Sequence, residues 1–124
     1  MIQRALVIFL GGGLGSILRF YLGWRLNLTY GHFPFGTLLA NVVSSFILGL
    51  LMAYYMTNPS WREDSRLFLM TGFCGGFSTF STFSSEVVLL LKEGQTGLAF
   101  FYLGISVLLG LLAIYLGMKV YGLR

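Results

Sequence analysis

Charged residues are scarce in this sequence: Asp, Glu, Lys and Arg make up 10% of the 124 residues, whereas 56% are hydrophobic. Soluble domains carry roughly 25% charged residues, and so few charges cannot cover a core this apolar in water. We therefore expect a single domain over residues 1–124, an all-α membrane protein whose solvent is mostly lipid. The net charge of +4 is spread over loops and ends, which argues against a nucleic-acid partner.

Cysteine and acidic residues are also few. Cys74 is the only cysteine, so an intrachain disulfide and a cysteine-based zinc cluster are both excluded. The four acidic residues form no pair suited to acid–base catalysis, and no nucleophile stands beside a base. An enzyme is therefore not expected.

Long apolar runs, by contrast, are abundant. Four segments, at roughly 2–23, 37–55, 67–91 and 98–121, are long enough to cross about 30 Å of hydrocarbon as helices. Gly11 and Gly15 lie one turn apart, as do Gly12 and Ser16, and this spacing favours close helix packing. Arg19 lies near the end of the first segment. It either extends to the membrane interface or supplies positive potential at the mouth of a vestibule.

The third segment has a composition that a plain spanning helix does not need. Gly72, Gly75 and Gly76 come within five positions, and each weakens a helix by roughly 1 kcal/mol relative to Ala. A break at membrane depth leaves backbone groups without partners, so it persists only where it is buried in protein or lines a wet cavity. The pattern predicts an interrupted third helix, and the interruption is the first candidate for a functional site.

Phenylalanines alternate with hydroxyl residues just after these glycines. Phe80 and Phe83 are three positions apart and share a face of the helix. A phenyl ring has a positive edge, so rings aimed into a narrow pore would attract an anion while hydroxyl groups replace its water. Glu86 follows as the only carboxylate within a span, where such residues are usually functional. Asn41, in the second span, either bonds a neighbouring helix or donates N–H groups to a passing anion.

The distribution of basic residues gives a weak topology signal. With four spans, one side carries Arg4, Arg62, Arg66, Lys119 and Arg124, and the other carries Arg19, Arg25 and Lys92. This is little asymmetry for the positive-inside rule. The sequence therefore favours insertion in both orientations, with two copies pairing antiparallel as an inverted repeat.

Three motifs together resemble the Fluc (CrcB) family of small bacterial fluoride channels over essentially the whole chain. They are GGLG at 12–15 with Arg19, PFGT at 34–37 with Asn41, and the long run GFCGGFSTFSTF at 72–83 followed by Glu86. The resemblance implies passive fluoride-selective export in the bacterial inner membrane, by an antiparallel dual-topology homodimer with two pores. Ser78 stands where threonine is usual in the family, and Ser44 where glycine is frequent.

The same resemblance assigns roles to individual residues. The fluoride path would be lined by Asn41, Phe80, Ser81, Thr82, Phe83, Glu86, Tyr102 and Ser106. Arg19 and Thr37 would belong to the vestibule. The backbone carbonyls of Gly75 and Ser78 would hold a structural Na⁺ at the dimer centre.

Two other functions remain open on the sequence alone. A small multidrug-type exporter would also be a four-span dual-topology dimer, with Glu86 exchanging protons for a cation. Exporters of that kind need a carboxylate in the first span, and this sequence has none there. A non-conducting scaffold is supported only by the small-residue packing faces.

Overall fold

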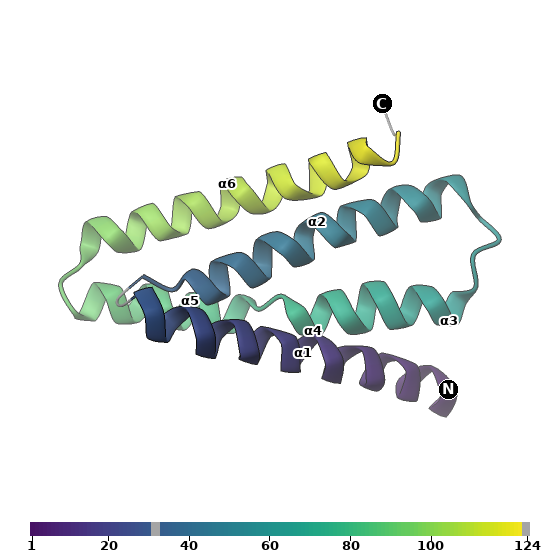
Figure 1. Cartoon of the computed structure of the whole chain (residues 1–124), viewed down its shortest axis with the longest axis horizontal. Coiled ribbons are helices and arrows are strands. Elements are labelled where there is room, and N and C mark those ends of the chain that lie inside the picture. Colours follow the sequence, from purple (N-terminus) through teal and green to yellow (C-terminus); the bar gives the residue numbers. More distant parts are fainter. Residues whose placement is uncertain (31–32, 123–124) are drawn as a thin grey trace.

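The computed structural model describes residues 1–30 and 33–122, and it contains four helical segments apolar enough to cross a membrane. Three are the helices α1 (Ile2–Tyr30), α2 (Phe35–Thr57) and α6 (Thr96–Val120). The third span, between α2 and α6, consists of the pieces α3 (Glu63–Arg66), η1 (Leu67–Cys74), α4 (Gly75–Phe77) and α5 (Phe80–Lys92) (Figure 1). The described residues form no strand, so the prediction of an all-α protein with four helices apolar enough to cross a membrane is confirmed. Arg124, counted in the topology argument, lies outside the described residues.

Two pairs of helices form the bundle. Figure 1 shows α1 running beside the third span and α6 running beside α2, and the same pairs make the most extensive contacts. Glycines allow both approaches: a Cβ at Gly15 would overlap the carbonyl oxygen of Phe73, and one at Gly49 would overlap that of Ile114. The small-residue spacing in the first span therefore serves close helix packing, as the sequence predicts.

The third span is interrupted, but not at its glycines. Ser78 (φ −76°, ψ 157°) and Thr79 (φ −153°, ψ 120°) are extended, whereas Gly72, Gly75 and Gly76 are helical. A Cβ at Gly76 would overlap the carbonyl oxygen of Gly12, so this glycine is needed for contact with α1. The location inferred from helix propensity was thus wrong by a few residues, because helix packing stabilises these glycines in the helix.

The stretch before the break is a π-helix, which the sequence did not predict. η1 covers the eight residues Leu67–Cys74; π-helical turns are rare in proteins and frequently occur at functional sites. The third span thus changes from α-helix to π-helix at η1 and back to α-helix at α4. The extended residues Ser78 and Thr79 follow before α5 begins.

Candidate functional site

Asn41 of α2 faces the break and bonds both backbone groups of Thr79, one of its two extended residues. Its Nδ2 donates to the carbonyl oxygen of Thr79 at 3.2 Å, and its Oδ1 accepts from the Thr79 N–H at 2.7 Å. An unpaired backbone group in lipid costs several kcal/mol, so this amide stabilises the extended conformation of Thr79. The two roles considered for Asn41, bonding a neighbouring helix and donating to a passing anion, are therefore compatible. One N–H bonds the third span, and the second remains for another acceptor.

Two serines bond the carbonyl of Cys74, one helical turn before the break. The carbonyl oxygen of Cys74 accepts from Ser44 Oγ at 2.8 Å and from both Oγ and N–H of Ser78, at 2.9 and 3.0 Å. The sequence analysis did not find this role for Ser44. The sequence did contain a sign of it: Ser44 lies in an apolar span three residues after Asn41, and a hydroxyl group needs a hydrogen-bond partner in lipid.

Arg19 also lies at the break. Its Nε donates to the carbonyl oxygen of Gly76 at 3.2 Å, and Ser16 Oγ donates to the same oxygen at 3.3 Å. Arg19 therefore stabilises the end of the helical segment that precedes the break. Thr37, the other residue assigned to a vestibule, has a different partner and donates to Glu86.

Side-chain donors bond the carbonyls of Cys74, Gly76 and Thr79 next to the break. Between these residues lie Gly75 and Ser78, the two positions at which the family resemblance expects a cation. Gly75 is exposed on the surface of the chain, and a Cβ there would meet no other atom within 4 Å. Its backbone is therefore accessible to a group outside this chain.

A polar cavity of about 250 Å³ opens beside the break. It brings together four of the eight residues predicted for the fluoride path, Asn41, Phe80, Phe83 and Ser106, and its other lining residues are Ser45, Ser78, Thr79 and Val107. Ser106 Oγ is buried and has no hydrogen-bond partner among the described residues. The cavity thus combines an unpaired hydroxyl, a spare amide N–H and two aromatic rings.

The two phenylalanines have different environments. Their ring centroids are 6.0 Å apart with an interplanar angle of 47°. The side chain of Phe83 is 9% exposed, while that of Phe80 is 80% exposed and projects from the chain. Phe83 meets Tyr102 in an edge contact with centroids 5.1 Å apart. Only Phe83 therefore belongs to the core of this chain.

Glu86 lies in a cluster with two hydroxyl groups beyond the cavity. Thr37 Oγ1 donates to Glu86 Oε1 at 2.7 Å, and the Tyr102 hydroxyl donates to Oε2 at 2.8 Å. Thr37 and Tyr102 are both buried, at 5% and 0% exposure. Because Tyr102 contacts both Phe83 and Glu86, a continuous series of side chains leads from the cavity to the carboxylate.

The last two predicted path residues follow the break on α5. Thr79 Oγ1 donates to Thr82 Oγ1 at 3.0 Å and accepts from the Thr82 N–H at 3.3 Å, so it caps the helix. Ser81 is exposed on the surface of the chain. Neither residue lines the polar cavity, and the same is true of Glu86 and Tyr102.

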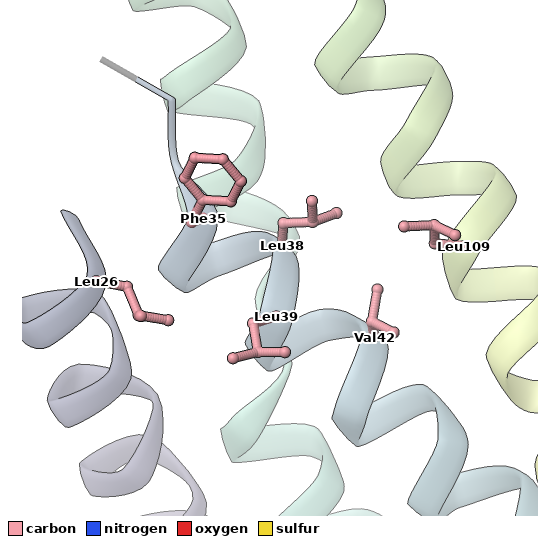
Figure 2. A pocket seen from close by; sticks show the side chains of 6 residues that line it. All are labelled: Leu26, Phe35, Leu38, Leu39, Val42 and Leu109. Atoms are coloured by element: carbon pink, nitrogen blue, oxygen red, sulfur yellow. The ribbon is translucent and has the colours of Figure 1, made fainter. Parts of the chain in front are cut away.

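A different cavity, of about 300 Å³, lies between α1, α2 and α6 and contains only apolar side chains. Figure 2 shows Leu26, Phe35, Leu38, Leu39, Val42 and Leu109 around it. Without a hydrogen-bond donor it offers nothing to replace the water around a small anion. It is therefore excluded as part of a polar path.

Comparisons with known proteins agree on one family. Residues 6–118 match the family model described as CrcB-like protein, Camphor Resistance (CrcB). The protein named fluoride-specific ion channel FluC from Pectobacterium atrosepticum is 43% identical over 111 residues, covering 90% of this chain and 84% of the relative. The protein of the same name from Pseudomonas aeruginosa is 48% identical over 99 residues, covering 80% and 78%. That from Paraburkholderia phymatum is 43% identical over 117 residues, covering 94% and 93%.

Proposed function

Since this chain belongs to the CrcB-like protein family, whose curated relatives are named fluoride-specific ion channels, we propose that it is a passive fluoride-selective channel that exports fluoride. The observation that carries the proposal is the polar cavity at the helix break. It places the rings of Phe80 and Phe83 beside the Asn41 amide and the unpaired hydroxyl of Ser106. The exporter alternative is not favoured, because the relatives carry the name of a channel.

The chemistry of this cavity suits fluoride, which is small and strongly hydrated. To leave water, the ion needs hydrogen-bond donors, and Asn41 and Ser106 each have one free. Ring edges add a weak positive potential without a full charge. Conduction requires binding that is weak enough to permit exit, and no Lys or Arg among the described residues lines the cavity.

From the cavity, the path would continue along Phe83 and Tyr102 to the cluster of Glu86 and Thr37. Thr37 lies near the start of α2, so this cluster is near one end of the spans. Here Tyr102 and Thr37 supply hydroxyl groups and Glu86 supplies an acceptor. We assign Ser81 and Thr82 to the same path, on the surface of α5 that a second copy would cover.

A single copy would expose groups that lipid does not tolerate. Gly75 presents open backbone at membrane depth, and Ser81 and Ser85 are exposed on the same span. Burying such groups against protein avoids a cost of several kcal/mol each. A second copy would also cover Phe80 and complete the wall of the cavity. With the weak basic-residue asymmetry, this favours an antiparallel dual-topology homodimer with two pores, in the bacterial inner (plasma) membrane.

The carbonyls of Gly75 and Ser78 fit the cation that the family resemblance implies. The neighbouring carbonyls of Cys74, Gly76 and Thr79 already accept side-chain hydrogen bonds, whereas the backbone at Gly75 is open to a group outside the chain. A Na⁺ ion would neutralise the partial negative charges of carbonyls from two copies. We expect a higher Tm in sodium than in N-methylglucamine at equal ionic strength. Equal Tm values in the two salts would argue against the ion.

The decisive experiment for the function is ion efflux from proteoliposomes loaded with fluoride or with chloride. We expect fast fluoride efflux and chloride efflux no faster than in protein-free vesicles. Phe100→Ile is the matched control for replacing Phe80 or Phe83 by isoleucine. Phe100 is 65% exposed on α6 and lines neither the polar nor the apolar cavity. Absence of fluoride efflux from a correctly folded preparation would refute the proposal.

A further inference from the structure

A third cavity, of about 400 Å³, lies far from the helix break, where α3 and η1 meet α1. It is lined by Val7, Arg62, Asp64, Ser65, Phe68 and Leu69. Figure 1 places α3 and the N-terminus at the same end of the bundle. None of these residues belongs to the path proposed for fluoride, so the cavity requires a separate explanation.

Its lining is divided into an apolar and a polar part. Val7, Phe68 and Leu69 are apolar and partly buried on α1 and η1. Arg62 and Ser65 lie at the start of the third span, which begins at Glu63 and therefore marks a membrane surface. A polar rim at the membrane surface above an apolar wall matches the structure of a phospholipid, which has a charged headgroup and hydrocarbon chains.

Of the three arginines at this end within residues 1–122, Arg62 has the most accessible guanidinium. Arg4 is bonded to Glu63 at 2.9 Å, and Arg66 lies over the Tyr55 ring at 4.8 Å. Arg62 has only a 3.8 Å contact with Asp64, and its side chain is 83% exposed. Its N–H groups are therefore available for a phosphate oxygen, which arginine binds in a bidentate manner.

The charge around the cavity favours an anionic ligand. Arg4 pairs with Glu63 and Arg62 with Asp64, and Arg66, which lies over the Tyr55 ring, leaves this end with a positive excess. The opposite end of the bundle carries Arg25, Lys92 and Glu93 and is also positive on balance. A second copy, parallel or antiparallel, therefore offers no complementary charge, whereas anionic lipid headgroups do.

We propose that this cavity binds an anionic phospholipid of the surrounding bilayer. The headgroup phosphate accepts hydrogen bonds from Arg62, and the first part of one acyl chain lies against Val7, Phe68 and Leu69. The lipid thereby holds α1 against the start of η1. This site is independent of fluoride conduction and does not rest on the proposed function.

Trp61 provides a local probe, because it directly precedes Arg62. In a Trp24→Phe background it is the only tryptophan. The full chain is reconstituted in two kinds of vesicle, one with brominated phosphatidylglycerol and one with brominated phosphatidylcholine. In both lipids the bromine lies on the upper part of the acyl chain. Bromine quenches tryptophan fluorescence on contact. We expect an apparent affinity about fivefold higher for phosphatidylglycerol, the ratio that one basic side chain at a membrane surface provides.

Four variants distinguish a defined lipid site from general electrostatic attraction. Arg62→Gln should remove the preference for phosphatidylglycerol, while Lys92→Gln, which deletes one exposed charge at the other end, should preserve it. Val7→Phe, which fills the apolar part of the cavity, should reduce quenching by phosphatidylglycerol although every charge remains. Arg62→Lys should retain part of the preference and shows that position 62 tolerates substitution.

Several outcomes would overturn the proposal. Equal quenching by the two lipids would do so, as would a preference that survives Arg62→Gln. A preference lost equally in Lys92→Gln, or unchanged in Val7→Phe, would indicate diffuse surface charge instead of a site. Inorganic phosphate in the buffer should not compete at millimolar concentration. If it does, the cavity binds free phosphate and not a lipid.

Discussion

The amide of Asn41 pairs with both backbone groups of Thr79, at 3.2 and 2.7 Å, and so replaces a helical neighbour at the one place where the third span is extended. The two residues lie on different spans and 38 positions apart. The break in the third span is thus held open by a side chain of the second span. Asn41 also lines the polar cavity, so this pairing fixes the orientation of its remaining N–H there.

The first prediction concerns this pairing. Asn41→Asp can still accept from the Thr79 N–H but cannot donate to its carbonyl, and it adds a negative charge beside the path. We expect fluoride efflux to fall by at least about tenfold, and stability to fall by about 1–3 kcal/mol for the group left unpaired. Efflux is measured with a fluoride electrode and stability by thermal unfolding in detergent. Normal efflux at neutral pH would contradict the role of Asn41 in the path.

The second prediction separates the two phenylalanines. Phe80→Ile and Phe83→Ile should both strongly reduce fluoride efflux, because both remove a ring edge from the cavity. Only Phe83→Ile should also destabilise the chain, by about 0.5–1.5 kcal/mol beyond the lost area, since it loses the edge contact with Tyr102. Size-exclusion chromatography checks that the assembly is intact. Wild-type efflux in both variants would exclude an aromatic-edge mechanism.

The third prediction concerns the carboxylate. Tyr102→Phe removes the hydroxyl that donates to Glu86 at 2.8 Å and leaves Thr37 as its partner. A hydrogen bond to a charged group contributes about 1.5–3 kcal/mol, so we expect a lower Tm together with slower fluoride efflux.

Glu86→Gln distinguishes the channel from the exporter. Proton-driven cation uptake that is present in the wild type and abolished by this change would favour the exporter.

The fourth prediction tests the glycine contacts between α1 and the third span. Gly76→Ala places a Cβ against the carbonyl of Gly12 and should cost about 1–3 kcal/mol, the usual range for overpacking. Gly13→Ala is the matched control, because a Cβ there meets nothing within 4 Å. Thermal unfolding of the two variants compares them directly. A similar Tm for both would show that the close approach is not needed for stability.

Much of this architecture could be predicted from the residues alone. The low charge and the four apolar runs determined a membrane protein with four spans, because each run is long enough for hydrocarbon and too apolar for water. The spacing of Gly11 and Gly15 predicted a close contact between helices. The run at 72–83 indicated an interrupted third span, although the extended residues turned out to be Ser78 and Thr79.

Only the tertiary structure decided which groups meet. Whether Asn41 reaches Thr79, or Glu86 lies between Thr37 and Tyr102, depends on the rotation and axial offset of separate helices. Local sequence does not encode that rotation clearly in lipid, where apolar residues surround a helix on all sides. The glycines of the third span show the same limit: alone they weaken a helix, and only the backbone of α1 beside them makes helical packing favourable.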